Sequence, residues 1–218
     1  MRKVPLITGE YYHVYNRGVD KRNIFGTKGN LNRFLQSIDA FNTEEPTGGL
    51  YGLSFDEKFG RRTSKSKKLV EIICFCLNPN HFHFLLKQVT KNGISEFIKR
   101  LSGGYTKYFN EKNDRSGVLF QGKFKSSHVD SNKYLLHLSV YINLNNLVHE
   151  LDKRELKELS FSSWKEYIEE NSSNSRCGKQ IILGQFKSRE EYKNFAENIL
   201  PDIISRKTEE NTKDFYID

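Results

Sequence analysis

Two histidines separated by one residue, His81 and His83, are the first candidates for chemistry in this chain. They follow the turn-forming sequence Asn78-Pro79-Asn80, which lies between two β-prone stretches and predicts a hairpin. Because side chains alternate along a strand, we expect both imidazoles on one face and Phe82 and Phe84 on the other. Two imidazoles on one face of a strand can form half of a metal or phosphate site. Histidines on the solvent face of a half-buried sheet have the same spacing, so the pair alone does not distinguish the two cases.

A second group of polar side chains lies in residues 133–147, where the apolar spacing predicts a helix that begins after Asp130–Asn132. His137, Tyr141 and Asn145 recur every four residues there and therefore share one side of the predicted helix. A tyrosine at such a position often belongs to the rim of a core. Beside a histidine pair in a basic protein, the hydroxyl of Tyr141 can also act as a nucleophile and the amide oxygen of Asn145 as a metal ligand.

These residues can be combined into a site that acts on a phosphodiester. Attack at phosphorus needs an oxygen nucleophile in line and stabilisation of the developing charge. The Tyr141 hydroxyl can be the nucleophile, which predicts a covalent phosphotyrosine in place of hydrolysis. His81, His83 and the amide oxygen of Asn145 can hold one divalent cation, Mg²⁺ or Mn²⁺, with positions left open for phosphate and water. Since a phosphotyrosine conserves the energy of the ester, such a site can also rejoin strands.

The composition favours a nucleic-acid partner. The formal net charge is +8 and the pI is about 9.2, values that suit a protein with a polyanionic partner. Of the three cysteines, Cys74 and Cys76 lie at i and i+2 of a predicted strand and are poorly placed to bond each other. The N-terminal residues lack the apolar segment of a signal peptide, and no run reaches membrane-spanning length. We therefore expect a soluble protein of a reduced, bacterial-type cytoplasm, with no membrane partner.

The elements around the hairpin are predicted from hydrophobic periodicity. Residues 10–16 alternate as in a strand, with Tyr11, His13 and Tyr15 on one face, and we take His13, like His137, as a candidate to line the site. Helices are expected over 30–41, 95–112 and 188–200, and an edge strand within 118–129.

Two segments depart from this pattern. Residues 43–69 contain a proline and several glycines and end in the basic run Arg61–Lys68, which predicts an insertion or a long basic loop. That loop is either simply solvated or in contact with phosphate. From Pro201 onward the chain is polar and predicts a loose arm.

Aromatic and basic side chains interleave in residues 118–129, a pattern that suits stacking on bases and neutralising phosphates. An ordinary edge strand with outward-facing lysines shows the same pattern. The side chains that we select as DNA-binding candidates are Arg17, Arg22, Arg61, Arg62, Lys107, Gln121, Lys123 and Lys125.

Several motifs, in the same order along residues 10–150, give the chain a family resemblance. The motifs are Tyr12–Val19, Asn78–Leu86, Tyr105–Asn110, Ser116–Lys125 and Tyr134–Asn145. In these motifs the sequence resembles the single-tyrosine HUH transposases, and above all their REP-associated tyrosine transposase branch. One departure is Asn146, which stands where the family usually has a proline.

The resemblance implies an α+β fold, a ferredoxin-like palm of four to five antiparallel strands with packed helices. It assigns His81 and His83 as the HUH histidine pair, Tyr141 as the nucleophile and Asn145 as the third metal ligand. It further implies that the substrate is single-stranded DNA, recognised through a hairpin beside the cut, and that the products are a 5′-phosphotyrosine and a free 3′-hydroxyl. Such an enzyme would carry out DNA transposition or recombination.

We predict a catalytic domain over residues 1–150 and a helical extension with a tail over 151–218. The segment Phe161–Tyr167 resembles the common ending of the branch, and we expect Trp164 and Tyr167 in it to cap the core.

Two other functions are compatible with the same residues. The first is a non-catalytic module that binds single-stranded DNA or RNA hairpins on the same fold; it predicts salt-sensitive binding without metal dependence. The second is a metal-dependent phosphodiesterase that uses the histidine pair and an activated water, although the chain lacks the further motifs of a two-metal site. The protein is expected to be a monomer or a homodimer.

Overall fold

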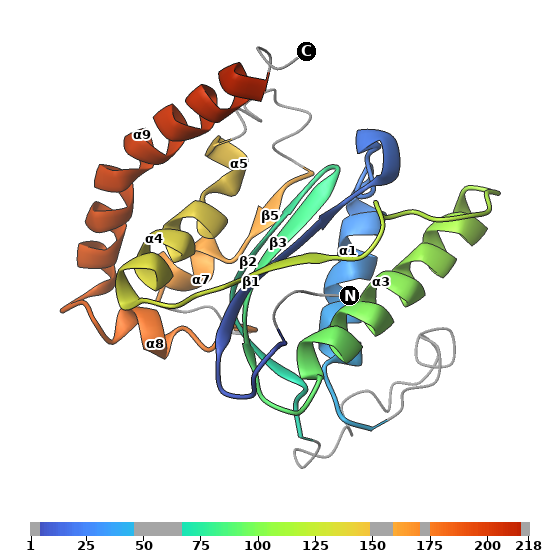
Figure 1. The fold of residues 1–218 in the computed structure, drawn as a ribbon, viewed down its shortest axis with the longest axis horizontal. Helices are drawn as coiled ribbons and strands as arrows, with labels where there is room; N and C mark the ends of the chain where they lie inside the picture. The colour runs from blue at the N-terminus through green and yellow to red at the C-terminus, as the bar shows by residue number, and fades with distance from the viewer. Residues whose placement is uncertain (1–4, 46–66, 149–158, 171–174, 215–218) are drawn as a thin grey trace.

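A computed structural model describes residues 5–45, 67–148, 159–170 and 175–214 of the chain. Its centre is a five-stranded antiparallel sheet with helices on both faces (Figure 1). The strand order is β4-β1-β3-β2-β5. The strands are β1 (Tyr11–Arg17), β2 (Val70–Asn78), β3 (His81–Gln88), β4 (Lys125–His128) and β5 (Phe161–Ser162).

The order of elements along the chain defines the topology. Strand β1 is followed by α1 (Lys28–Phe41), β2, β3, α3 (Gly93–Lys112) and β4. This β-α-β-β-α-β series, with β3 between β1 and β2, is the ferredoxin-like arrangement. The expected α+β fold with an antiparallel palm is therefore confirmed.

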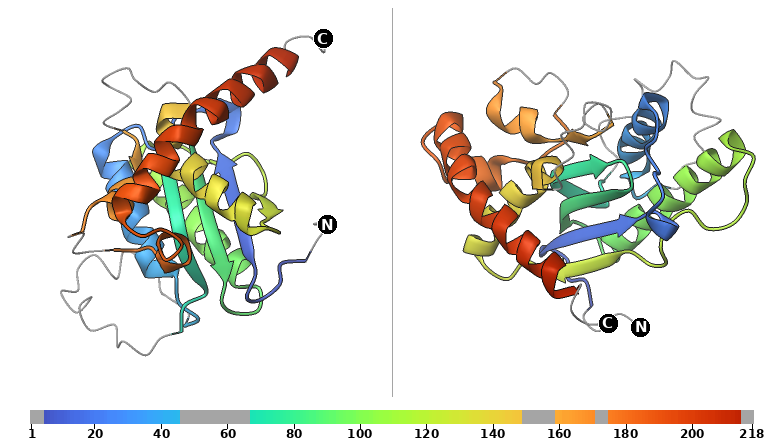
Figure 2. Two further views of the ribbon diagram at one scale, coloured as in Figure 1. Left: turned by 90° about the vertical axis from the view of Figure 1, so that its left-hand side faces the viewer. Right: turned by 90° about the horizontal axis from the view of Figure 1, so that it is seen from above.

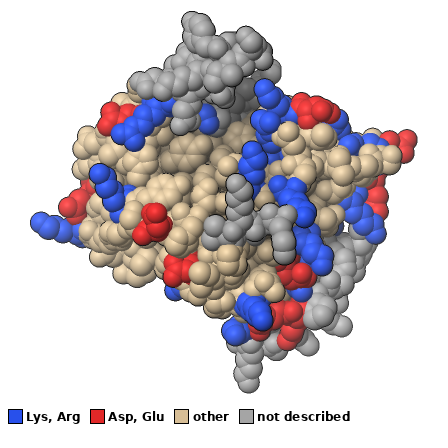
Figure 3. Space-filling view, in the orientation of Figure 1, with Lys and Arg blue, Asp and Glu red and all other residues tan. Residues whose placement is uncertain are grey.

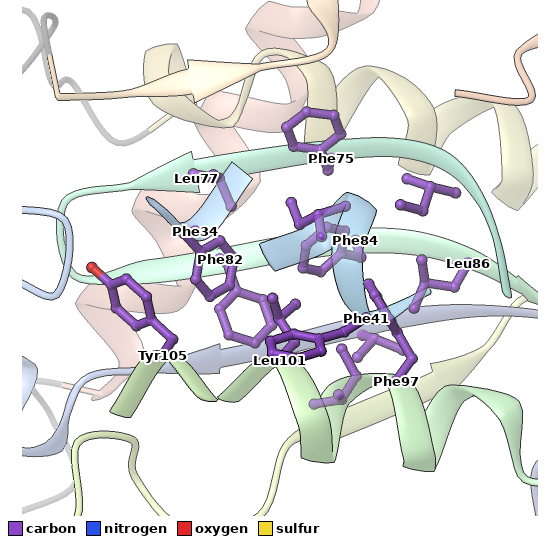
Figure 4. Close-up of a cluster of buried hydrophobic side chains, with 14 of the residues drawn as sticks. Phe34, Phe41, Phe75, Leu77, Phe82, Phe84, Leu86, Phe97, Leu101 and Tyr105 are labelled. Carbon is purple, nitrogen blue, oxygen red and sulfur yellow. The ribbon is translucent and has the colours of Figure 1, made fainter. Parts of the chain in front are cut away.

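The first face of the sheet is covered by α1 and α3, because the alternation of each strand directs large apolar side chains toward them. Figure 4 shows these side chains interlocking between the sheet and the two helices. Phe34 of α1 contacts Tyr105 of α3 edge-on and Phe82 of β3, and all three side chains are almost completely buried. The Tyr105 hydroxyl donates a hydrogen bond to the carbonyl of Ile24. This aromatic core fixes the sheet that carries the histidine pair.

The second face is covered by helices from later in the chain, with α9 on the outside of α4 and α5 (Figures 1 and 2). These helices are α4 (Asn132–Asn143), α5 (Asn145–Val148), α7 (Trp164–Ile168), α8 (Gln180–Leu183) and α9 (Arg189–Asp214). Tyr167 is fully buried and donates to the carbonyl of Ile73, and Trp164 packs against Tyr192 of α9. The expectation that these two aromatics belong to the core is confirmed.

Most predicted elements are present with shifted ends, but two are shorter than expected. The stretch 118–129 contains only the short strand β4, because residues 118–124 form a loop. This loop passes the end of β1, where the backbone N–H of Gln121 donates to the carbonyl of Arg17 over 2.8 Å. The helix expected over 133–147 ends at Asn143, and α5 begins after Leu144.

The polar stretch after Pro201 is not a loose arm. Helix α9 continues through Pro201 to Asp214. A proline inside a helix costs a backbone hydrogen bond, but here Ile203 is 4% exposed and Ile204 packs against the same core. Burial of these two residues explains why the helix continues where local sequence predicts its end. The described residues also include a short 3₁₀ helix, η1 (Val19–Lys21).

Residues 46–66 of the expected 43–69 insertion, with Arg61 and Arg62, lie outside the described residues, as does the boundary near residue 150. The division into a domain over 1–150 and an extension over 151–218 stays a prediction. Within the described ranges, Tyr167, Ile182 and Tyr192 of the extension share one core cluster with Cys74, Cys76 and Leu85 of the sheet.

Candidate active site

The site lies on the second face of the sheet, at the end where β3 begins. Strand register places Arg17 opposite His81 and Tyr15 opposite His83, and on the other side of β3 it places Asn78 opposite His81. Because directly opposite residues point to the same face, the alternation predicted from sequence brings these side chains together. The two imidazole rings are perpendicular, with centroids 5.1 Å apart.

His83 is held by a third histidine, His13 of β1. Their rings are stacked, and Nε2 of His13 lies 2.8 Å from Nδ1 of His83. Burial lowers the pKa of His13 to about 4, so this imidazole is neutral at pH 7. One of the two rings donates and the other accepts. The bond fixes the orientation of His83 and leaves its Nε2 directed away from His13. Metal-binding histidines usually have such a hydrogen bond on the ring nitrogen that does not bind the metal.

His81 is oriented by the two asparagines of the turn. Its Nδ1 lies 2.6 Å from Oδ1 of Asn80, and its Nε2 lies 3.0 Å from Nδ2 of Asn78. From this network we assign the neutral ring with the hydrogen on Nδ1. The pKa of His81 is lowered to about 4, mainly by burial and also by the positive charges of Lys207 and Arg17, against the opposing effect of the Asn145 side-chain oxygen, which favours the charged ring. A neutral imidazole is the form that binds a cation.

Asn145 reaches the same point from the opposite side. It is completely buried at the first position of α5, and its Oδ1 accepts from Nδ2 of Asn78 over 2.7 Å and lies 3.3 Å from Nε2 of His81. Its Nδ2 has no hydrogen-bond partner within the described ranges. The break between the two helices at Leu144 turns the chain so that Asn145 faces the strand pair.

Asn146, which follows Asn145, stands where the family that the motifs resemble usually has a proline. Asn146 lies in the first turn of α5, where a proline also fits because that N–H needs no helical partner. Here the Asn146 backbone N–H is bonded to the thiol of Cys76. Burial raises the pKa of this thiol to about 12, and the bond to Asn146 opposes that rise. The backbone therefore enters α5 without the proline.

Tyr141 lies beside the histidines, in the last turn of α4. Its ring is edge-on to His83 with centroids 5.6 Å apart, and edge-on to His13 at 6.0 Å. On another side, Nζ of Lys207 lies 5.9 Å from the centre of the ring. The structure thus brings together all four residues that sequence analysis proposed for the reaction, and it places the site-lining candidate His13 beside them.

A pocket of about 490 Å³ opens beside the histidine pair. It is lined by both histidines and by several cationic and polar side chains: Tyr15, Asn16, Arg17, Lys21, Asn80, Gln121, Lys125 and Lys207. Figure 3 shows Lys and Arg side chains gathered along this part of the surface. A concave site with one sign of charge concentrates polyanions.

The DNA-binding candidates separate into groups. Arg17, Gln121 and Lys125 line the pocket. Lys123 lies in another pocket with Phe120 and Phe124, and Lys107 lies in a third, where it pairs with Glu111. Arg22 pairs with Asp20 over 3.2 Å.

His137 is not brought to the pocket. It lies beside α9, and its pKa is lowered by burial and by the charges of Arg206 and Lys133, against the opposing effect of Asp202. His137 lies four residues before Tyr141, about 6 Å further along the helix axis, so a shared helix side does not place it in the site.

The donor atoms of the candidate ligands decide which metal the site can hold. Among the described residues, no three His, Cys, Asp or Glu side chains are arranged so that they could hold a metal ion. The candidate ligands are instead two neutral imidazoles and an amide oxygen, with Oδ1 of Asn145 and Nε2 of His81 directed toward each other. Such a set suits a divalent cation that tolerates nitrogen and oxygen, such as Mn²⁺, and leaves positions for phosphate. The residues therefore fit the expected metal.

Sequence reasoning missed three residues of this site. Asn78 and Asn80 were treated as turn residues only, although their positions directly before His81 could have indicated a role in orienting that imidazole. Lys207 had no signal at all, because only the packing of α9 brings it to the pocket.

The fold and the site define an α+β protein of ferredoxin-like topology with a histidine pair and a tyrosine beside a basic pocket. Residues 58–145, which contain the pair, Tyr141 and Asn145, match the family model described as "Transposase IS200 like". This segment of the chain is therefore similar to IS200-like transposases.

Solved structures also resemble the chain. One is a REP-associated tyrosine transposase bound to a REP hairpin, with 15% identity, a TM-score of 0.48, and coverage of 78% of this chain and 85% of that one. Another is a proposed transposase from Deinococcus radiodurans R1, with 12% identity, a TM-score of 0.37, and coverage of 62% and 91%. No curated protein matches the chain. Within the described ranges, no helix is long and apolar enough to cross a membrane.

Proposed function

We propose that this protein cleaves and rejoins single-stranded DNA beside a hairpin through a covalent 5′-phosphotyrosine on Tyr141. The observation that carries the proposal is the position of Tyr141. Its ring lies 5.6 Å from that of His83, and Oδ1 of Asn145, one helical turn further along the chain, lies 3.3 Å from Nε2 of His81. A candidate nucleophile from α4 and three candidate ligands from β3 and α5 therefore lie close together, and the two histidines line the basic pocket.

The proposed reaction is a transesterification. The Tyr141 oxygen, having lost its proton, forms a bond to phosphorus as the bond from phosphorus to the 3′ oxygen breaks. The 3′ oxygen leaves with the electron pair and takes up a proton, which gives a free 3′-hydroxyl and a 5′-phosphotyrosine. In the reverse direction, a 3′-hydroxyl attacks the phosphotyrosine and releases the tyrosine. One ester bond replaces another, so rejoining needs no external energy.

His81, His83 and Asn145 would hold the divalent cation, Mg²⁺ or Mn²⁺. When bound, the cation supplies charge stabilisation to the phosphate and helps to orient the scissile bond. The hydrogen bonds that His81 makes with Asn80 and that His83 makes with His13 orient the two imidazoles for this task. Asn78 holds the amide oxygen of Asn145 toward the same point.

The basic pocket would bind the DNA on either side of the cut. Arg17 and Lys125 would neutralise phosphates, and the Tyr15 ring, which stacks on His83, offers an aromatic surface to a base. The requirement for a hairpin comes from the family resemblance of the motifs.

The test is a denaturing gel with purified protein, Mn²⁺ and labelled single-stranded hairpin DNA from beside its own gene. We expect a DNA–protein adduct that disappears on chelation and in Tyr141→Phe, while hairpin binding changes little. Tyr134→Phe, a substitution on the same helix, is the matched control and should keep the adduct. Tight binding without an adduct, across several hairpins, would overturn the proposal in favour of a non-catalytic binding module.

A further inference from the structure

The C-terminal half of α9 is packed beside the candidate active site. Ile203 is buried and Ile204 is packed against the core cluster that includes α4. Residues four apart lie on one side of a helix, so the position of Ile203 directs Lys207 toward the same part of the molecule. Figure 2 shows α9 passing over α4 and α5 toward the sheet. The family match ends at residue 145, so this helix lies outside the matched segment.

Lys207 reaches the reacting groups from this helix. Its Nζ lies 5.9 Å from the centre of the Tyr141 ring, and its side chain lines the same pocket as His81 and His83. Arg17 and Lys125 line the pocket from the strands. Lys207 is therefore a cation beside the candidate nucleophile, on the side contributed by α9.

We propose that Lys207 is a further catalytic residue, which contacts a non-bridging oxygen of the phosphate that Tyr141 attacks. This role rests on the proposed function. Attack at phosphorus places charge on the phosphate oxygens, and a cation held in a partly buried site stabilises that charge more than water does. An ammonium acts on phosphate as a point charge. The proposed role of Lys207 is that of a charge only, so it adds no proton transfer to the reaction.

The other explanation of this contact is structural. A lysine over a tyrosine ring forms a cation–π interaction, worth about 0.5–1 kcal/mol at exposed sites. If Lys207 only packed against the tyrosine ring, an uncharged side chain of the same length would support the same rate of adduct formation. The effect of the substitution would then also be the same on a charged and on a neutral phosphate. Lys207→Met tests that case, Lys207→Gln is a second variant should the first fail to fold, and Lys207→Arg retains the charge.

The experiment measures adduct formation in single turnover, with Mn²⁺ and saturating hairpin DNA. We expect Lys207→Met to slow the reaction roughly 100-fold, as the loss of one charge-stabilising group does, and Lys207→Arg to recover most of the rate. Lys193→Met, on the N-terminal half of α9, is the matched control and should react at the wild-type rate. Hairpin affinity should change only a few-fold.

A neutral phosphate separates catalysis from packing. A methylphosphonate at the scissile position replaces the charged non-bridging oxygen by a methyl group. Since Lys207 then has no charged oxygen to contact, the wild type and Lys207→Met should react at similar rates. Equal rates of the two proteins on the natural phosphate would overturn the role of Lys207 alone, as would an unchanged ratio on the methylphosphonate. A wild-type protein that forms no Tyr141-dependent adduct would overturn the proposed function, and this role with it.

Discussion

The amide of Asn78 donates a hydrogen bond to the side-chain oxygen of Asn145 over 2.7 Å. The same Nδ2 lies 3.0 Å from Nε2 of His81, so one amide group at the end of β2 holds two candidate ligands from different elements. Asn78 is completely buried, and its Oδ1 accepts from Ser160. The two ligands are thus oriented before any cation binds.

Asn78→Leu should weaken Mn²⁺ binding roughly 10- to 100-fold, as loss of an outer-shell partner commonly does. Titration calorimetry of the purified protein measures the affinity. Asn42→Leu is the matched control, because Asn42 bonds the backbone of Val70 at the other end of the same strand. It should lower stability without changing Mn²⁺ affinity. Equal loss of affinity in both variants would mean that Asn78 acts only through the fold.

His13→Phe should also weaken Mn²⁺ binding and slow adduct formation. The ring is kept, but the 2.8 Å hydrogen bond that orients His83 is lost. Tyr15→Phe is the control, since it removes only a hydroxyl from a ring that stacks on the same histidine. Wild-type Mn²⁺ affinity in His13→Phe would show that the His13–His83 bond does not orient a ligand.

Arg17→Ala and Lys125→Ala should each weaken hairpin DNA binding and reduce the salt dependence of the affinity. Each phosphate contact on a single strand contributes about 0.7 to the slope of log affinity against log salt. Lys107→Ala, at a lysine in a different pocket that pairs with Glu111, should leave the slope unchanged. Fluorescence anisotropy at several salt concentrations gives all three values. If Lys107→Ala lowered the slope as much as Lys125→Ala, the DNA would follow a different surface.

Phe34→Ala should lower the free energy of unfolding by about 3–5 kcal/mol, because it opens a cavity in the aromatic core against Phe82 and Tyr105. Val118→Ala is the control: Val118 is 69% exposed, and its loss should change stability by less than about 0.5 kcal/mol. Urea denaturation measures both. A loss below about 1 kcal/mol in Phe34→Ala would contradict the packing described.

His137→Gln should reduce the loss of stability in mild acid. The pKa of His137 is lowered in the folded protein, with burial as the largest cause, below its unfolded value of about 6.5. The unfolded chain then binds more protons, so the contribution of His137 is fully present above about pH 6.5 and is lost as pH falls through the folded pKa. The melting temperature of the variant should fall less than that of the wild type between pH 7 and pH 5. An equal fall would contradict the shift.

Much of the fold could be predicted locally, because periodicity is a property of neighbouring residues. The turn 78–80 and the alternation after it defined the hairpin and placed His81 and His83 on one face. The apolar spacing of α1 and α3 defined the helices that cover the other face. Asn145 and Tyr141 were selected by their helical spacing, and the fold brings both to the histidines.

Other features depended on contacts between distant segments. The His13–His83 bond joins strands 70 positions apart, and the Asn78–Asn145 bond spans 67 positions. Helix α9 continues past Pro201 because Ile203 is buried against other elements, a contact that local propensity does not contain. The sequence by itself determined which residue types could bind a cation and attack a phosphate, and on which face of each element they lie. Only the tertiary structure decided which of them meet, and that Lys207 joins them, because packing of the second face sets those distances.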